Sequence, residues 1–200
     1  MNETASFRPL SLLLFGFALL LAACSPSGAG DPPLKGASIG GPFTLTDQDG
    51  RRVSDTAFKG KYRLFYFGFT YCPDVCPVDL QVIGQGLRQI EKSDPDIAAK
   101  VQPIFISVDP ERDTPAVIKQ YVAAFHPRLI GLTGTPAEIK DVTKRFGVYS
   151  AKQGQEGAKD YLVDHSRITL LFGPGGEPIA IVPHEKGAGG IAEELKRWVK

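Results

Sequence analysis

Two cysteines and one histidine are the residues of this chain whose side chains could do chemistry together. Cys72 and Cys76 are separated by three residues, and His165 follows Asp164 after a short apolar run. Two thiolates and one imidazole form a soft ligand set that suits copper, especially Cu(I), or zinc. The same spacing lets both sulfurs face one ion or join in a disulfide. The spacing alone therefore leaves metal binding and thiol–disulfide exchange open.

The other two histidines have simpler interpretations. His126 precedes Pro127 at the expected end of a helix, and His184 lies in a polar loop, so capping or surface roles account for both. For His165, a functional role and a buried histidine bonded to backbone are equal alternatives from position alone.

The cysteines follow a strand that the sequence predicts to be buried on both faces. Residues 64–69 form an aromatic-rich apolar run, and apolar residues at helical spacing follow as far as Ile90. A proline disfavours α geometry in the residue before it, and Pro73 and Pro77 follow the two cysteines directly. We therefore expect both thiols on the strand-to-helix loop, where amides and the helix dipole lower a thiol pKa.

The rest of the chain predicts an α/β fold. Strands 43–46 and 51–53 form an N-terminal β-hairpin, and a charged turn at residues 109–114 provides a helix start. The remaining predicted strands are 101–109, 129–132, 148–150, 161–164, 168–172 and 179–182, and the remaining helices are 115–125, 135–147 and a C-terminal one containing Ile191 and Trp198. This order indicates a mixed sheet with helices on both faces, with the cysteine pair at the carboxyl end of a strand.

The N-terminus predicts a processing signal followed by a linker. Residues 1–23 combine a polar start, an apolar run and small residues before Cys24, and residues 24–38 are rich in Pro, Gly and Ser. The signal resembles a bacterial lipobox. That resemblance implies a signal peptide, lipidation of Cys24, and a location on a membrane of the bacterial cell envelope, facing the periplasm or another extracytoplasmic space. An ordinary secretory signal or a membrane anchor is the alternative. The folded domain is expected over residues 39–200.

Composition excludes one class of partner and narrows the metal ligands. A formal net charge of +1 gives no basic field for nucleic acid. The only methionine is Met1, so a copper site in the mature chain must use Cys and His. Removing Cys24 from the count leaves one matched pair, which forms a disulfide in an oxidising compartment unless it is reduced or metallated.

Three separate motifs carry a family resemblance over roughly residues 40–182. They are Gly-Phe-Thr-Tyr-Cys-Pro-Asp-Val-Cys-Pro at 68–77, Ser-Val-Asp-Pro-Glu-Arg-Asp-Thr-Pro at 107–115, and Val-Asp-His-Ser at 163–166 with Gly-Pro-Gly-Gly at 173–176. Together they resemble the Sco/SenC family of copper-binding cytochrome c oxidase assembly proteins.

The resemblance implies a thioredoxin-like fold and one copper ion, as Cu(I) and Cu(II), bound by Cys72, Cys76 and His165. Asp164 is then a residue that orients the histidine. The implied function is delivery of copper to the binuclear copper centre of cytochrome c oxidase, reduction of that centre's cysteines, or both. The implied partners are the copper-accepting oxidase subunit, other copper chaperones or thiol reductants, and a membrane reached through the lipid anchor.

An enzyme is the alternative to a metallochaperone without turnover. Redox members of the thioredoxin fold generally use Cys-x-x-Cys and a facing cis-proline, whereas this pair is one residue longer and no proline occurs between Pro136 and Pro174. The Thr-x-x-Cys pattern of thiol peroxidases is absent too, because Thr70 lies only two residues before Cys72. These differences favour the metallochaperone over a thiol–disulfide reductase, and a copper or redox sensor using the same site stays open.

Overall fold

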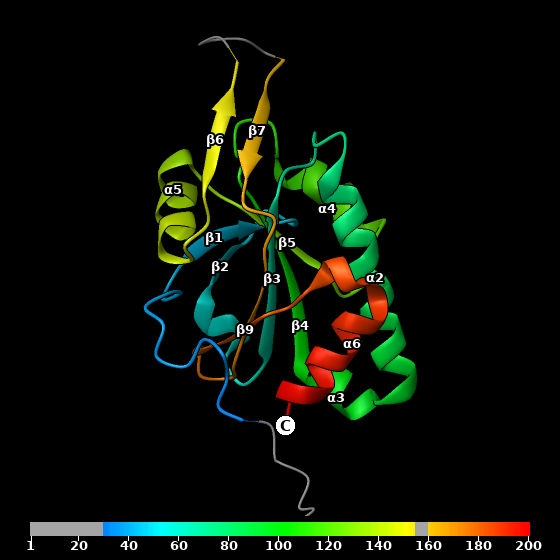
Figure 1. Cartoon of the computed structure of the whole chain (residues 1–200). Coiled ribbons are helices and arrows are strands. Elements are labelled where there is room, and N and C mark those ends of the chain that lie inside the picture. Colours follow the sequence, from blue (N-terminus) through cyan, green and yellow to red (C-terminus); the bar gives the residue numbers. More distant parts are fainter. Residues whose placement is uncertain (1–29, 155–159) are drawn as a thin grey trace, which may run out of the picture. The chain divides into compact units, whose positions relative to one another are not determined.

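Strand β3 (Tyr62–Gly68) is buried along its whole length at the centre of the protein. It pairs in parallel with β4 and antiparallel with β8 within a seven-stranded mixed sheet of order β2-β1-β5-β4-β3-β8-β9 (Figure 1). The other strands of this sheet are β1 (Thr44–Asp47), β2 (Arg52–Ser54), β4 (Val101–Ser107), β5 (Ile130–Thr133), β8 (Thr169–Phe172) and β9 (Pro178–Ile181). The predicted hairpin is confirmed, because β1 and β2 pair antiparallel around Gly50, whose φ is 80°.

The computed structural model describes residues 30–154 and 160–200, of which Asp31–Lys200 form one unit. The predicted signal and Cys24 lie outside these residues and stay predictions. Within the described part, no helix has the length and apolar character needed to cross a membrane. The described end of the predicted linker differs from expectation. Leu34 packs against the core and its amide donates to the Ile179 carbonyl at 3.0 Å, so the ordered domain begins earlier than residue 39.

Helices cover both faces of the sheet. They are α2 (Val75–Ser93), α3 (Pro95–Lys100), α4 (Pro115–Ala123), α5 (Pro136–Arg145) and α6 (Gly187–Trp198), with two short 3-10 helices, η2 (Asp55–Phe58) and η3 (His184–Lys186). Tyr66, Phe105 and Gly131 lie side by side in register and therefore share one face. Helix α4 packs against this row, and a Cβ on Gly131 would overlap Ile118 of that helix. Helix α5 packs against the opposite face through Phe146, the residue that follows it.

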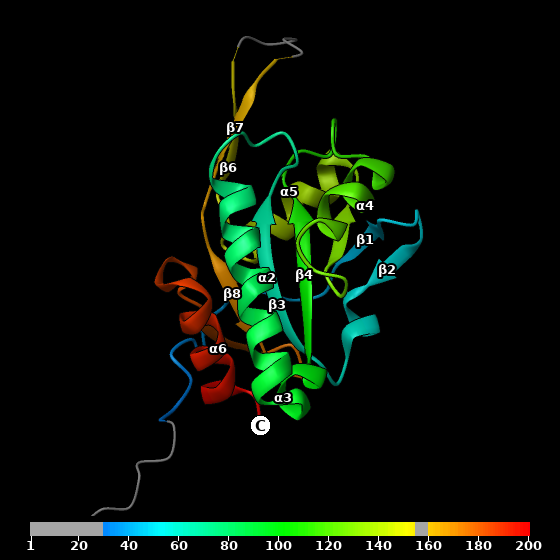
Figure 2. The same cartoon turned by 90° about the vertical axis from the view of Figure 1, so that its right-hand side faces the viewer.

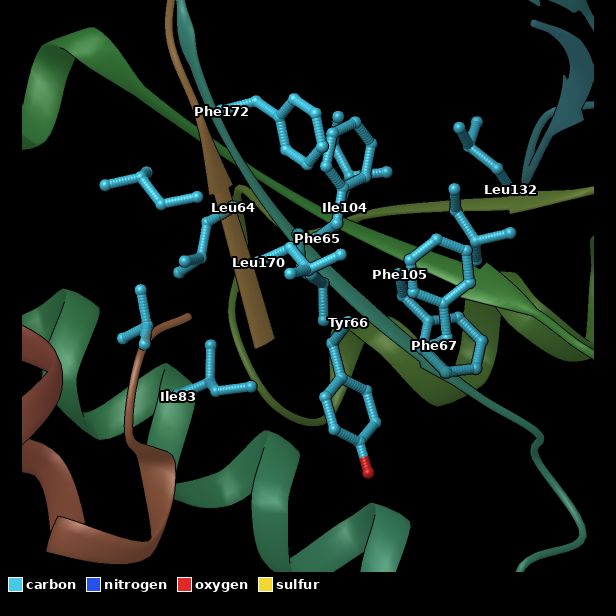
Figure 3. Packing of buried hydrophobic residues seen from close by; sticks show 14 of the residues in the cluster. Leu64, Phe65, Tyr66, Phe67, Ile83, Ile104, Phe105, Leu132, Leu170 and Phe172 are labelled. Carbon is cyan, nitrogen blue, oxygen red and sulfur yellow. The ribbon is translucent and has the colours of Figure 1, made fainter. Parts of the chain in front are cut away.

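Aromatic side chains fill the face that α5 covers. The ring of Phe65 packs edge-on against Phe146 and Phe172 at centroid distances of 4.9 and 5.5 Å. Tyr66, one residue along β3, points to the other face, and Figure 3 shows its hydroxyl directed away from the other labelled side chains. The alternation along β3 thus places one tyrosine hydroxyl beneath α2, the helix that carries Cys76.

Strands β6 (Ser150–Gln153) and β7 (Leu162–His165) form a separate antiparallel pair. They extend beyond the end of the sheet at which β3 leads into α2 (Figures 1 and 2). His165 is the last residue of β7, so this small sheet brings the histidine to the same end of the domain as the cysteines.

Local signals account for several helix ends. The predicted capping box is present, since Thr135 accepts from the Glu138 amide while the Glu138 carboxylate accepts from the Thr135 amide. Thr114 caps α4, and Gly147 adopts a φ of 67° after α5. The prediction for Cys76 is wrong: it is the second residue of α2 and not part of a loop. Pro77 fits there because the first-turn amides of a helix have no partner within it.

Candidate metal centre

Cys72, Cys76 and His165 meet at the carboxyl end of β3. Their candidate ligand atoms all lie within 4.8 Å of one another, and the Cys76 Sγ lies 3.2 Å from His165 Nε2. The Cys76 amide also donates to Cys72 Sγ at 3.4 Å. The residues singled out from the sequence are therefore adjacent, although 89 positions separate the histidine from Cys76. In the described residues both cysteines are free thiols.

The two thiols differ in exposure. Cys72 is partly exposed, whereas Cys76 is fully buried. Burial raises the pKa of the Cys76 thiol well above its ordinary value, because a thiolate is poorly solvated there, and the contact with Cys72 adds to the rise. The prediction that the helix terminus lowers both pKa values is thus wrong for Cys76, since desolvation outweighs the helix dipole.

Gly68 makes room for the buried sulfur. A Cβ at this position would lie 3.0 Å from Cys76 Sγ and 3.1 Å from Tyr66 Cε1. The only break in the aromatic run of β3 therefore has a steric cause at the metal centre. A side chain at Gly68 would displace a candidate ligand.

Backbone hydrogen bonding fixes the tautomer of His165. Its Nδ1 lies 3.1 Å from the Ser166 carbonyl oxygen, which can only accept, so Nδ1 carries the proton of the neutral ring. This leaves the Nε2 lone pair facing Cys76. Burial lowers the pKa of His165, and the bond to Ser166 opposes this only in part, which favours the neutral, ligand-competent imidazole.

The remaining acid and histidines predicted from the sequence lie elsewhere. Asp164 is exposed and accepts from Gln153 Nε2 at 2.6 Å, so the Ser166 carbonyl and not Asp164 makes the direct contact with His165. His126 is buried away from the cysteines, with its Nε2 3.3 Å from Glu91. His184 is also buried, which the sequence did not predict, and its Nε2 lies 3.3 Å from Asp79 Oδ2.

The charged turn after β4 supports the cysteine loop. Asp113 is fully buried and accepts from the Thr70 amide at 3.1 Å, the Thr70 hydroxyl at 2.6 Å and the Ser107 hydroxyl at 2.5 Å. Burial raises the pKa of Asp113, against the lowering effect of these hydrogen bonds. Its contacts tie the segment before Cys72 to β4, which confirms a structural use of this motif.

The same turn also holds the chain that leads into β7. Buried Asp109 accepts from Arg112 Nε and from the Tyr161 hydroxyl, both at 2.6 Å. Arg112 lies over the Tyr161 ring at 3.6 Å and donates to the Tyr161 carbonyl at 2.9 Å. The turn is thus connected to the cysteine loop on one side and to the histidine-bearing strand on the other.

A buried polar network beneath the centre was missed at the level of the sequence. Asp79 of α2 accepts from the Tyr66 hydroxyl at 2.9 Å and from two nitrogens of Arg167 at 2.6 and 3.0 Å. The available signal was a carboxylate within the apolar stripe of α2, one turn after Cys76. Nothing in the local sequence of Arg167 indicated its partner.

Comparisons with known proteins agree with this geometry. Residues 31–200 match the SCO1/SenC family. A curated relative, the mitochondrial SCO1 homolog 1 of Arabidopsis thaliana, is 48% identical over 69% of this chain and 40% of its own length. A solved structure of Bradyrhizobium japonicum ScoI with copper bound has 45% identity and a TM-score of 0.72, covering 80% of this chain and 99% of that one.

A further solved structure is BsSco, described as a member of the Sco family of cytochrome c oxidase assembly proteins that has a disulfide switch. It has 25% identity and a TM-score of 0.61, covering 83% of this chain and 97% of that chain. The α/β, thioredoxin-like architecture with a mixed sheet is therefore confirmed. The chain spans 40, 54 and 52% of the length of the first curated relatives, so about half of each.

One prediction is contradicted by these relatives. The curated proteins from Arabidopsis thaliana, Saccharomyces cerevisiae and human are all described as mitochondrial, which conflicts with a location in a bacterial cell envelope. The prediction rested on the resemblance of residues 1–24, with their polar start, apolar run, small residues and Cys24, to a lipobox. That short pattern lies outside residues 31–200, which match the family, so the folded domain itself carried no signal for the compartment.

Proposed function

This chain belongs to the SCO1/SenC family, and we propose that it binds one copper ion through Cys72, Cys76 and His165. The observation that carries the proposal is the convergence of two sulfurs and the unprotonated Nε2 within 4.8 Å. Two thiolates suit Cu(I), and the imidazole adds the nitrogen that Cu(II) prefers, so one set of residues serves both oxidation states. Copper-bound relatives of the same fold support this choice over zinc.

The proposed role is assembly of cytochrome c oxidase, either by delivering copper to its binuclear centre or by reducing that centre's cysteines. The partner would be the copper-accepting subunit, and other copper chaperones or thiol reductants would load the domain. This part rests on what the relatives are described as doing. A signal over residues 1–23 and an anchor at Cys24, followed by a short linker, belong to the same proposal, without an assigned compartment.

The difference in exposure between the two cysteines supports different roles for them in the proposed transfer. Cys72 is partly exposed and can be reached by a thiolate of the partner, whereas Cys76 is enclosed by the core. A copper ion leaving this site would therefore exchange the Cys72 sulfur first and the Cys76 sulfur last. The raised pKa of Cys76 favours its protonation once the ion has left, which opposes rebinding.

A thiol–disulfide reductase is the second candidate function. Two free thiols with sulfurs within 4.8 Å favour it, because a small movement would allow a disulfide. The attacking group in such a reaction would be Cys72, since the buried Cys76 has a raised pKa and forms thiolate with difficulty.

Anaerobic Cu(I) competition on the reduced domain, beside a disulfide-reduction assay, separates the two functions. The copper proposal expects one Cu(I) per chain in the parent and loss of tight binding in Cys72→Ser and in Cys76→Ser. The matched control for Cys76→Ser is Thr143→Ser, which removes one buried methyl group and keeps the hydroxyl that donates to the Ile139 carbonyl within α5. Rapid reduction of a disulfide substrate by a parent that does not bind copper would replace the proposal by the second candidate.

A further inference from the structure

We propose that the ion pair between Asp79 and Arg167 positions His165 against the two cysteines. The inference rests on the proposed copper site and concerns residues that do not touch the ion. Asp79 lies three residues after Cys76 on α2, and Arg167 lies two residues after His165, so the pair joins the two segments that carry ligands.

His165 needs such a connection because its own anchors are local. Its Nδ1 bonds to the carbonyl of the next residue, and its backbone pairs with Ser150 in the small β6–β7 sheet. Neither of these two contacts reaches α2, which His165 touches through its Nε2 against Cys76 Sγ at 3.2 Å, the contact that has to be positioned. Arg167 supplies the link through two parallel hydrogen bonds, Nη2 to Oδ1 at 2.6 Å and Nε to Oδ2 at 3.0 Å. A bidentate guanidinium–carboxylate pair fixes orientation as well as distance.

Asp79 is itself held rigidly, so it can act as a fixed point. The Tyr66 hydroxyl donates to Oδ2 at 2.9 Å, and His184 Nε2 lies 3.3 Å from the same oxygen. His184 is held in turn by Thr169 of β8, whose hydroxyl lies 3.0 Å from Nδ1. Burial alone would raise the pKa of Asp79, but hydrogen bonds from His184, Arg167 and Tyr66 outweigh it and hold the pKa below its ordinary value. The carboxylate is therefore charged and anchored to two strands of the central sheet.

The proposal predicts a selective effect on copper chemistry. Residues that orient a ligand without touching the metal typically change metal affinity by about 10- to 100-fold when they are replaced. We expect Arg167→Gln to lower Cu(II) affinity by about this factor, because Cu(II) depends on the imidazole. Cu(I), which two thiolates can hold, should keep its affinity within about twofold.

A matched control exists in the same domain. Arg52 also makes a two-pronged pair with a carboxylate, that of Glu138, and its side chain is 50% exposed compared with 48% for Arg167. Arg52→Gln should therefore show the cost of losing a comparable ion pair without the effect on Cu(II). Because Arg167 is half exposed, Arg167→Gln should fold, whereas Asp79→Asn perturbs a buried network and is the weaker variant for this purpose.

The decisive experiment is a double-mutant cycle on the full chain, in which the Cu(II) and Cu(I) affinities are measured. It compares the parent with Arg167→Gln, His165→Ala, the variant that combines these two changes, and the control Arg52→Gln. We expect Arg167→Gln to have no further effect on the Cu(II) affinity once His165 is absent. Proton NMR of the metal-free protein adds an independent measurement. Contacts between His165 and Phe69, whose ring centres are 5.9 Å apart, should weaken in Arg167→Gln alone.

Three outcomes would overturn the inference: unchanged Cu(II) affinity in Arg167→Gln, an equal loss in Arg52→Gln, or a loss that persists without His165. A parent that binds no copper would instead refute the proposed function. In that case the NMR contacts still decide whether Arg167 positions the histidine, so the two failures are distinguishable.

Discussion

Replacing Gly68 by alanine is a direct steric test of how the core and the metal centre share space. The added Cβ would lie 3.0 Å from Cys76 Sγ, 3.1 Å from Tyr66 Cε1 and 3.3 Å from Phe105 Cε2. All three neighbours belong to fully or almost fully buried residues, so none can move without disturbing the packing around it. Gly68 does not have a positive φ, so backbone strain makes no contribution.

Overpacking of this kind typically costs about 1 to 3 kcal/mol of unfolding free energy. For a domain of this size, that corresponds to a fall of about 2 to 12 °C in Tm, measured by circular dichroism. The same crowding should displace Cys76 Sγ and weaken Cu(I) binding. The control is Gly189→Ala on α6, where a Cβ would meet nothing within 4 Å and helix propensity should raise stability by about 0.5 to 1 kcal/mol. Equal Tm changes in the two variants would refute the steric reasoning.

Three further predictions concern buried polar groups, two of them near the metal centre. Tyr161→Phe removes the hydroxyl that donates to buried Asp109, and should cost about 1 to 3 kcal/mol in chemical denaturation because one carboxylate oxygen loses its partner; a stability within error of the parent would contradict this. The lowered pKa of Asp79 means that its ionised form stabilises the fold above the unfolded value of 3.8, and that this contribution is lost on acidification below it. Asp79→Asn should therefore lose less stability than the parent as the pH falls below 3.8. If the unfolding free energies of the two proteins fell in parallel with pH, this reasoning would be wrong. The lowered pKa of His126, caused by burial, means that stability should fall as pH drops below 6.5, and His126→Gln should reduce this dependence in pH-resolved thermal melts; an unchanged profile would exclude this histidine as the cause.

The sequence predicted the elements well where local chemistry determines them. The aromatic run of β3, the hairpin around Gly50 and the capping box at Thr135 each carry a physical signal within a few residues. The two cysteines could be named as soft donors from their residue type and spacing, whereas His165 was selected from the three histidines through the resemblance of its motif to the family. That the three lie together, however, depends on β7 ending beside α2, which no local pattern specifies.

Contacts between distant segments account for the features that were missed. Arg167 and His184 find Asp79 only after β8, η3 and α2 have packed together, so neither is distinguishable from a surface residue in the sequence. The pKa of Cys76 was mispredicted for the same reason, because the helix terminus is visible locally whereas the surrounding core is not. Leu34 is likewise a single apolar residue in a segment whose composition is typical of a linker. Its packing against the core and its hydrogen bond to Ile179 form only in the folded chain.

Cu(II) titration of the reduced protein, followed by absorbance, in the parent and in His165→Ala decides whether the histidine is a copper ligand. We expect one Cu(II) per chain in the parent, with thiolate-to-copper charge-transfer bands. We expect loss of those bands in His165→Ala while Cu(I) binding is largely kept, since the dithiol remains. Identical Cu(II) spectra and stoichiometry in the two proteins would remove His165 from the site and contradict the three-ligand centre built by Cys72, Cys76 and His165.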